Sequence, residues 1–462
     1  MPELPEVETV VRTLEHKIAG RTIKNVRVLW PNLIAYPETE AFCRQLVNQR
    51  FCKFGRRGKF LIFTLTDYVL VAHLRMEGKF YVYPEPTEPV KHTHIVFELD
   101  QGELHYNDVR KFGRFELYAR GESLAVLEEL GKEPFDPSLT GEQLKRFCRK
   151  KKTPIKSQLL DQHMIAGIGN IYANEICHAV RLFPETPSCF ISEEKWDEII
   201  AATARILKEA IEMGGTTIRS YTSSLGVTGL FQQKLAVHGQ VSKPCPDCGT
   251  EIVKKFVEGR GTYYCPSCQK ARPIMAAVSG NIGSGKSTVM DLLAEKGYAT
   301  VKTDELNAEV LQLRETKEHL AALYGCQPEE ITKDVIRNTI YSDADLKKKT
   351  EEYLHGRIWE MVLAFAGKHQ NEKVVFVEVP LLFEAGWNRR FDFNILVCAS
   401  RQTISKRLQE SRKMTKEDIE RVLNSQLADT EKKDRCDWVI TNDGQLAVLQ
   451  ASVEKLLAFI VK

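Results

Sequence analysis

The sequence predicts a multidomain protein in which a β-sandwich, a helical domain and a small metal ribbon precede an α/β domain with a parallel sheet. Three observations support this prediction. The apolar period changes from strand-like to helical near residue 136, two C-x-x-C pairs follow, and strand-like and helical runs alternate from Ile274 onward. At 462 residues and 43% hydrophobic, the chain can form about two to four domains, each with its own core.

The β-rich domain is expected within residues 1–135. Between residues 21 and 118, short apolar runs such as "FLIFTL", "YVLVAHL" and "HIVFEL" are separated by Gly, Pro and Asp. Short strands bounded by turn residues are typical of an all-β sandwich or barrel.

The helical domain is expected within residues 136–235. The runs "SLTGEQLKRFCRK" and "SEEKWDEIIAATARILKEAIEMG" have apolar residues at helical spacing after Ser or Thr. Ser and Thr are favoured helix N-caps, especially where Glu or Gln follows three residues later, so both runs predict helices.

The metal ribbon is expected within residues 236–270, where two C-x-x-C pairs are separated by sixteen residues. Each pair directs two sulfurs at one tetrahedral ion, so the spacing predicts a structural zinc site. Two disulfides or a chance spacing are the alternatives. The expected zinc ligands are Cys245, Cys248, Cys265 and Cys268.

The α/β domain is expected within residues 274–462, and it begins with a nucleotide-binding motif. "GNIGSGKS" at 280–287 matches G-x-x-x-x-G-K-[ST] between an apolar strand and a helical run, the context in which this motif forms a phosphate-binding loop. Lys286 would reach the β- and γ-phosphates of ATP, and Ser287 would hold Mg²⁺. The expected ATP-binding loop residues are Gly280, Gly283, Ser284, Gly285, Lys286, Ser287 and Thr288.

Composition narrows the class of protein further. No apolar run of 18 residues is present and the N-terminus lacks a secretory pattern, so we expect a cytoplasmic protein with no membrane partner. The net charge of +3 does not indicate a nucleic-acid binder, but residues 1–270 hold 37 Lys and Arg against 33 Asp and Glu. The run "KRFCRKKKTPIK" at 145–156 has seven cations and no acid. It predicts either a surface for the DNA backbone or a solvated helix face.

The N-terminus "MPELPE" has features of a nucleophile. Removal of Met1 would leave Pro2 with a free secondary amine, whose pKa near ~8 leaves a neutral fraction able to attack an electrophilic carbon. Glu3, next to it, is placed to supply a proton to a departing sugar oxygen. The alternative interpretation is a rigid N-terminal turn.

Seven segments between residues 2 and 270 together resemble the bacterial formamidopyrimidine-DNA glycosylases. They are "PELPEVETV", "RRGKFL", "HLRMEGK", "NDVRKFGRF", "IAGIGNIYANEICH", "GGTTIRSY" and "GRGTYYCPSCQ". The resemblance implies a helix-two-turn-helix fold for the helical domain. It also implies a DNA glycosylase/AP lyase that excises oxidised purines, 8-oxoguanine and formamidopyrimidines, from damaged double-stranded DNA.

The same resemblance implies roles for individual residues. Pro2 would form an imine with the sugar after the base leaves, and Glu3 would be the acid. Lys59 would assist β-elimination and Arg260 the following δ-elimination. The residues implied to fill the hole left by the flipped base are Met76, Arg110 and Phe112, and those implied to contact phosphates are His92, Arg110, Lys151 and Asn170. For Met76 and Phe112, core packing is the alternative. Relatives often have "VYGR" and "KPxLLD" where this chain has "VHGQ" and "KSQLLD".

The second half resembles dephospho-coenzyme A kinase over nearly all of 274–462. "VEVPLLFEAG", "SKRLQESRKMTKEDIERVLNSQ" and "DRCDWVITNDG" follow the family's order. The resemblance implies transfer of the ATP γ-phosphate to the ribose 3′-hydroxyl of dephospho-coenzyme A, with Asp304 as base or orienter and Glu378 near the metal. Arg407 and Arg412 would lie in a mobile lid; a solvated amphipathic helix is the alternative for both.

Two departures from this second family affect the expected site. Where the family has "TGGIGSGKS", the chain has Asn281 in place of the second glycine, and where the family has "DAD" it has Lys302, which replaces a carboxylate by a cation.

From the two resemblances together, we expect a monomeric fusion of two enzymes, with zinc in the first and Mg²⁺ with ATP in the second. The alternatives are an active glycosylase with a catalytically weak nucleotide-binding appendage, and a damage-binding protein without lyase chemistry.

Overall fold

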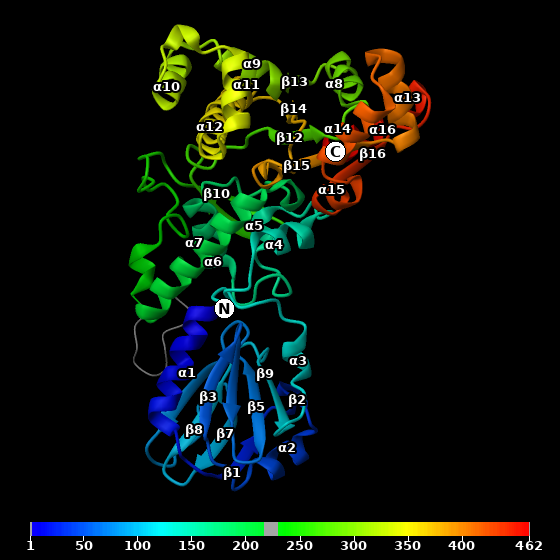
Figure 1. Cartoon of the computed structure of the whole chain (residues 1–462). Helices are drawn as coiled ribbons and strands as arrows, with labels where there is room; N and C mark the ends of the chain where they lie inside the picture. Colours follow the sequence, from blue (N-terminus) through cyan, green and yellow to red (C-terminus); the bar gives the residue numbers. More distant parts are fainter. Residues whose placement is uncertain (1, 217–229, 462) are drawn as a thin grey trace. The chain divides into compact units, whose positions relative to one another are not determined.

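The computed structural model describes residues 2–216 and 230–461, and these divide into two compact units (Figure 1). The first unit comprises 1–188 and 195–270, and the second comprises 189–194 and 271–462. Met1 and most of the "GGTTIRSY" segment lie outside the described residues. Within the described part of the chain, no helix combines the length and the apolar character needed to span a membrane.

The first unit begins with helix α1, which was not predicted, and continues with the predicted β-sandwich. One sheet has the order β1-β7-β8-β6 and the other β2-β9-β5-β4-β3, and only the β2 and β9 pairing is parallel. Apolar residues of both sheets and of α1 form one core, in which Phe80 of the first sheet meets Phe63 and Phe115 of the second. The elements are α1 Leu4–Ile18, β1 Ile23–Val28, β2 Ile34–Tyr36, α2 Thr39–Leu46, β3 Lys53–Arg57, β4 Phe60–Thr64, β5 Tyr68–His73, β6 Lys79–Tyr83, β7 Thr93–Leu99, β8 Glu103–Asn107 and β9 Arg114–Ala119.

Helices follow, and they end in a two-stranded ribbon. Helix α4 begins after Thr140, whose side chain accepts a hydrogen bond from the backbone N–H of Gln143, as its N-cap position requires. Strands β10 and β11 pair in antiparallel register from Val253↔Tyr264 to Val257↔Arg260. The elements are α3 Ala125–Glu128, α4 Gly141–Cys148, α5 Ile155–Gln158, α6 Asn170–Ala179, α7 Glu193–Glu212, β10 Val253–Val257 and β11 Arg260–Tyr264.

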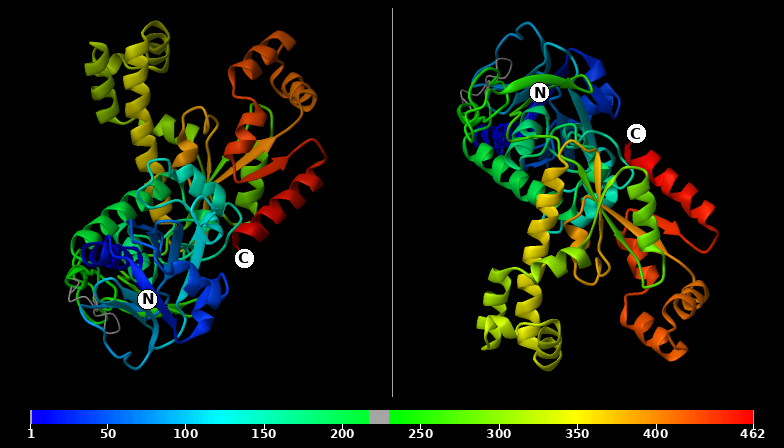
Figure 2. Two further views of the ribbon diagram at one scale, coloured as in Figure 1. Left: turned by 90° about the horizontal axis from the view of Figure 1, so that it is seen from below. Right: turned by 90° about the horizontal axis from the view of Figure 1, so that it is seen from above.

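The second unit is an α/β domain with a parallel five-stranded sheet of order β13-β14-β12-β15-β16, as predicted. Its two faces carry separate apolar cores, one under α8 and α16 and the other under α9 and α12 (Figure 2). The strands are β12 Ile274–Ser279, β13 Ala299–Lys302, β14 Val374–Glu378, β15 Phe393–Cys398 and β16 Trp438–Thr441. The helices are α8 Lys286–Glu295, α9 Thr303–Val310, α10 Arg314–Tyr324, α11 Lys333–Ser342, α12 Ala344–Lys368, α13 Arg401–Arg412, α14 Lys416–Ser425, α15 Asp429–Arg435 and α16 Leu446–Val461.

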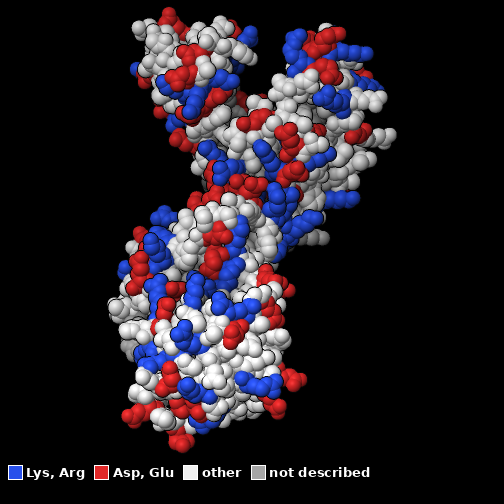
Figure 3. Space-filling view, turned by 60° about the horizontal axis from the view of Figure 1, so that its bottom comes forward, with Lys and Arg blue, Asp and Glu red and all other residues white. Residues whose placement is uncertain are grey.

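Positive and negative side chains are interspersed over the face of the molecule that Figure 3 shows. No single sign of charge covers either unit on that face, which agrees with the small net charge of +3. On that face, therefore, charge alone does not mark a nucleic-acid interface.

Candidate active sites and metal centre

A cavity of about 620 Å³ in the first unit brings together sequence segments more than 200 residues apart. It is lined by six of the residues expected to act on DNA, together with several that the sequence did not single out. The six are Pro2, Glu3, Lys59, Met76, Asn170 and Arg260.

Glu3 is a buried carboxyl held at the start of two helices. It is the N-cap of α1, and its Oε1 accepts a hydrogen bond from the backbone N–H of Ile171, 2.9 Å away at the start of α6. Gly169 makes this possible, because a Cβ on that residue would lie 2.3 Å from the Glu3 carboxyl carbon. Burial raises the pKa of Glu3 to about 7, although the nearby Lys59 ammonium opposes the shift. Glu3 can therefore keep its proton near neutral pH and act as an acid.

Lys59 is the second buried group with an altered pKa. Its Nζ donates to the Ile168 carbonyl oxygen at 2.7 Å. Burial lowers the pKa of Lys59 to about 8, while Glu3 and Glu6 act in the opposite direction. The amine thus has an accessible neutral form, which a base in an elimination step needs.

Two further residues of this cavity region were missed by the sequence analysis. Glu6 accepts hydrogen bonds from the Glu3 backbone N–H at 2.9 Å and from the Tyr172 hydroxyl at 2.8 Å. Lys156 is fully buried, and its Nζ donates to Asn170 Oδ1 at 2.5 Å. Burial lowers the pKa of Lys156 to about 8. Glu3 and Glu6 are an N-cap and its third helical residue, and this spacing could have identified Glu6 from the sequence.

Lys156 and Lys145 differ from the other cations of the basic run 145–156. That run was expected to form either a DNA surface or a solvated face, and these two of its seven cations are buried and can belong to neither, whereas the other five are exposed or half-buried. Lys156 lies in α5, and its side chain points inward, where Asn170 of α6 accepts its hydrogen bond.

His238 occupies the position where relatives have tyrosine, and its ring also lines the cavity. Asn174 Nδ2 donates to His238 Nδ1 at 2.8 Å, while Asn174 Oδ1 accepts from the backbone N–H of Tyr263, which fixes the orientation of the amide. Burial lowers the pKa of His238 to about 4, so the ring is neutral at pH 7. Because Nδ1 accepts, Nε2 carries the hydrogen and is a donor.

The other residues expected to contact DNA do not line this cavity. Phe112 is 47% exposed and the Arg110 guanidinium stacks on its ring at 4.6 Å. The turn that carries both is held by Asp108, which accepts from the backbone N–H groups of Arg110 and Phe112. Core packing therefore does not explain Phe112, and Met76 is likewise only half-buried.

The two remaining expected phosphate contacts lie in loops. His92 is half-buried in a loop with a positive φ of 73°. The Nζ of Lys151 lies 3.5 Å from the centroid of the Phe147 ring and 3.7 Å from an Asp161 oxygen. The cation is thus already placed against an aromatic ring.

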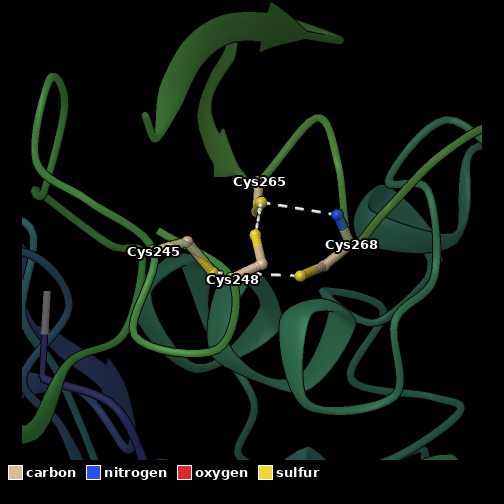
Figure 4. Close-up of side chains that lie close together, drawn as sticks. All are labelled: Cys245, Cys248, Cys265 and Cys268. Atoms are coloured by element: carbon tan, nitrogen blue, oxygen red, sulfur yellow. Dashed lines mark hydrogen bonds between the residues drawn. The ribbon is translucent and has the colours of Figure 1, made fainter. Parts of the chain in front are cut away.

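The four ribbon cysteines converge on one point (Figure 4). Their sulfurs lie within 4.8 Å of one another, with 3.9 Å between Cys245 and Cys268 and 3.5 Å between Cys248 and Cys265. A disulfide needs about 2.05 Å, so these pairs are free thiols and the two-disulfide alternative fails. Four sulfurs about 2.3 Å from a central zinc would lie about 3.8 Å apart, so the geometry fits a structural zinc ion.

The phosphate-binding loop of the second unit connects β12 to α8. Gly280 has a φ of 153°, and a Cβ there would lie 2.1 Å from the Val397 carbonyl oxygen, so only glycine fits. Lys286 Nζ donates to the Gly280 carbonyl oxygen at 2.8 Å. A cavity of about 850 Å³ lies against this loop. The expected residues that line it are Gly283, Gly285, Lys286, Ser287, Thr288, Asp304, Glu378, Arg407 and Arg412. Gly280 and Ser284 are buried and do not line this cavity.

Glu378 ends β14 beside this loop. Its side chain is buried, and within the described residues its Oε2 has no hydrogen-bond partner. Burial raises the pKa of Glu378, against the opposing effect of Lys286 and Lys302. An unpartnered carboxylate oxygen near Ser287 is the kind of ligand that Mg²⁺ prefers, so these residues fit the expected metal.

The two lid arginines differ in their surroundings. Arg407 donates to the Gly283 and Ser284 carbonyl oxygens at 3.4 Å and to the Asn442 carbonyl oxygen at 2.9 Å. It therefore contacts the loop directly, and the solvated-helix alternative does not describe it. Arg412 is exposed at the end of α13.

Asp304 lines two cavities at once. Besides the loop cavity, it borders a second one of about 280 Å³. The other residues of this second cavity include Asn307, Glu351, His355, Leu381 and Trp387. Lys302, two residues earlier, lies 3.7 Å from Glu305 and so pairs with an acid on the following helix. The carboxylate of Asp304 is thus placed between two ligand-sized spaces.

Family models match four consecutive parts of the chain. They are the formamidopyrimidine-DNA glycosylase N-terminal domain at residues 1–115, the H2TH domain of the same enzyme at 130–222, a zinc finger found in FPG and IleRS at 242–271, and dephospho-CoA kinase at 274–448.

Individual relatives cover the first 58% of the chain. The formamidopyrimidine-DNA glycosylase of Exiguobacterium sibiricum is 49% identical over 274 residues, with 99% of its length covered, and that of Shouchella clausii is 48% identical over 273 residues, also with 99% covered. Among solved structures, Lactococcus lactis Fpg in complex with DNA containing an abasic site matches with a TM-score of 0.55 and 37% identity, over 58% of this chain and 99% of that one. A mutant of that protein bound to Fapy-dG DNA matches with a TM-score of 0.56 and 37% identity, over 58% of this chain and all of that one.

Proposed function

Because this chain belongs to the formamidopyrimidine-DNA glycosylase family and carries a dephospho-CoA kinase domain after it, we propose that it performs both reactions. The first would remove oxidised purines from double-stranded DNA and cut the strand. The second would phosphorylate the 3′-hydroxyl of dephospho-coenzyme A with ATP. Both activities would reside in one monomeric, cytoplasmic protein.

The glycosylase proposal rests on the shared cavity of Pro2, Glu3 and Lys59. The Pro2 nitrogen lone pair would form a bond to C1′ of the sugar as the bond from C1′ to the damaged base breaks. The base would leave with the electron pair of that bond and take up the proton that the Pro2 nitrogen releases. Glu3 would give its proton to the ring oxygen, which opens the sugar and leaves an iminium on Pro2. Lys59 would assist removal of the C2′ proton, so that the 3′-phosphate leaves, and Arg260 would assist loss of the 5′-phosphate. A carboxyl with a pKa of about 7 beside the amine supports this assignment.

The residues outside the cavity would hold the DNA. An exposed aromatic ring with a guanidinium stacked on it, as in Phe112 and Arg110, suits insertion where a base has been flipped out. Met76, from the cavity wall, would fill the same gap. His92, Lys151 and Asn170 would bind phosphate oxygens, and the structural zinc would keep the β10–β11 hairpin in shape so that Arg260 faces the cavity.

Borohydride trapping on a duplex with 8-oxoguanine tests this proposal, because reduction captures an imine between protein and DNA. We expect a covalent adduct with the wild-type chain and none with Pro2→Gly. A wild-type chain that binds the duplex but gives no adduct would instead support the damage-binding alternative. Mass spectrometry of the purified protein adds a direct check, since retained Met1 would exclude Pro2 as the nucleophile.

The kinase proposal rests on the position of Asp304 between the two cavities of the second unit. ATP would occupy the loop cavity, with Ser287 and Glu378 holding Mg²⁺, which would neutralise phosphate charge when bound. Dephospho-coenzyme A would occupy the second cavity. Its 3′-oxygen would attack the γ-phosphorus while the bond to the β–γ bridging oxygen breaks, and Asp304 would accept the hydroxyl proton.

A phosphorylation assay with ATP and dephospho-coenzyme A tests the kinase, with Lys286→Ala as the inactive reference. Turnover in the wild type well above that reference is the expected result. One observation favours a weak kinase as the second candidate: Lys302 stands where the family has a carboxylate and pairs with Glu305. If that candidate is right, wild-type turnover stays at the Lys286→Ala level, and Lys302→Asp raises it.

A further inference from the structure

A buried polar cluster connects the phosphate-binding loop to helix α15. Asn281, in the loop, accepts a hydrogen bond at Oδ1 from Lys432 Nζ at 2.8 Å and donates from Nδ2 to Asp429 Oδ1 at 2.9 Å. Lys432 is fully buried and also lies 2.7 Å from a carboxylate oxygen of Glu384. We call these four residues, Asn281, Glu384, Asp429 and Lys432, the loop tether.

The backbone does not explain why the chain has asparagine at this position. Gly280, one residue earlier, has a positive φ that demands glycine, whereas the φ of Asn281 is not positive. The kinase family's usual residue here is a second glycine. What distinguishes Asn281 is therefore its side chain, which is 8% exposed and has both polar atoms engaged by α15.

The tether lies beside the resting position of the Lys286 side chain. Lys286, which reaches the β- and γ-phosphates in such loops, rests with its Nζ 2.8 Å from the Gly280 carbonyl oxygen and 3.2 Å from that of Asn281. The next residue, Ile282, donates its backbone N–H to Gln426 Oε1 at 3.1 Å. Two successive loop residues are thus held by the segment that runs from Gln426 to Lys432.

The burial of Lys432 makes this arrangement stiff. A buried ammonium that loses its partners costs several kcal/mol, so Lys432 must stay between Asn281 and Glu384. Glu384 in turn accepts from the Leu427 backbone N–H at 3.2 Å, which fastens the chain just after α14. Moving the loop away from α15 would leave a buried cation with one of its two oxygen partners missing.

We propose that Asn281 and Lys432 are positioning residues, which hold the γ-phosphate end of the loop in the conformation that binds ATP. The proposal rests on the kinase function proposed above.

The test uses the full-length protein and four variants: Asn281→Gly, Lys432→Met, the double variant and Lys432→Arg. ATP affinity is measured by calorimetric titration, and KM is measured separately for ATP and dephospho-coenzyme A. We expect each of the first two changes to weaken ATP binding and to raise the KM for ATP roughly tenfold, with the KM for dephospho-coenzyme A unchanged. The Kd of the double variant for ATP should be at most about twice that of the single variant that binds ATP less tightly, because both changes break the same contact. Lys432→Arg keeps the cation and should recover most of the affinity.

Lys433→Met is the matched control, because it removes an exposed cation from the same helix. It should leave ATP affinity unchanged. Asn281→Gly is the decisive variant if Lys432→Met fails to fold, and the melting temperature of the second unit reports whether each preparation is folded.

The outcomes separate the two proposals. ATP affinity that stays within about twofold of wild type in Asn281→Gly would overturn the tether, as would an equal rise in both KM values with a lower melting temperature, which indicates a purely structural role. If the wild type turns over no faster than Lys286→Ala, the proposed function fails, and the ATP affinities alone then decide the tether. A wild type that does not bind ATP overturns both.

Discussion

The two cavities that we propose as active sites prepare for chemistry in opposite ways. In the first unit, the reactive groups are buried and their pKa values are moved toward neutrality, to about 7 for Glu3 and about 8 for Lys59. In the second unit, the conformation of the loop places backbone N–H groups and cations where they could bind phosphates. In general, proton transfer depends on acids and bases with suitable pKa values, whereas phosphoryl transfer depends mainly on fixed donors and a metal.

The sharpest way to separate the two sites is to remove the N-terminal nucleophile. Pro2→Gly replaces the secondary amine by a more flexible primary one, and we expect imine trapping and strand cleavage to fall at least ~1,000-fold. Kinase turnover in the same preparation should be unchanged. Cleavage is followed on an 8-oxoguanine duplex by gel electrophoresis, and substantial residual cleavage would point to another nucleophile.

The reciprocal change is Lys286→Ala in the second unit. It removes the cation that neutralises the β- and γ-phosphates, so phosphorylation of dephospho-coenzyme A should fall by ~100-fold or more. Base excision should not change. A loss of both activities would show that the second unit supports the first and would break the contrast between independent sites.

Zinc removal should affect only the first unit. A ribbon of this size depends on its metal to fold, so a chelator should unfold the hairpin that carries Arg260 and reduce strand cleavage about 10- to 100-fold. Released zinc is measured with a colorimetric indicator. Cys265→Ser should behave like the chelated protein, whereas Cys326→Ser, at a cysteine outside the ribbon, should not. Cleavage that survives complete zinc loss would contradict the proposed role of the hairpin.

The smallest expected effect concerns the pH dependence of glycosylase activity. Glycosylase turnover needs neutral Pro2, with a pKa near ~8, and protonated Glu3, with a pKa of about 7, so the two requirements overlap between pH 7 and 8. We expect kcat/KM to be nearly flat there and to fall by about tenfold per pH unit on either side. The alkaline limb should disappear in Glu3→Gln, on whatever activity remains. If it persists in that variant, a group other than Glu3 causes it.

Local sequence patterns were sufficient where one short segment carries the whole signal. The two C-x-x-C pairs predicted the thiol cluster, and "GNIGSGKS" predicted a loop between a strand and a helix. Pro2, Glu3 and Lys59 were expected from motifs, and the fold brings them to one cavity.

The rest depended on contacts between distant segments, which no local pattern encodes. In the sequence, Lys156 is indistinguishable from the other cations of the basic run, and only its contact with Asn170 shows that it is buried. Asn281 was noted as a departure from a motif, and the sequence did not reveal its contact with Lys432, 151 residues later in the chain. His238 is similarly fixed in orientation by Asn174, 64 residues earlier, and made neutral by burial.

The position of Asp304 also has a pharmacological consequence. Since one carboxylate borders both cavities of the second unit, a single compound that joins a nucleotide mimic to an acceptor mimic would need only a short connection to fill both. Linking the two parts would turn the second contact into an intramolecular one, with an effective concentration on the order of millimolar. Such a bisubstrate inhibitor would leave the DNA-directed half of the protein untouched, and would separate the two activities by chemistry instead of by mutation.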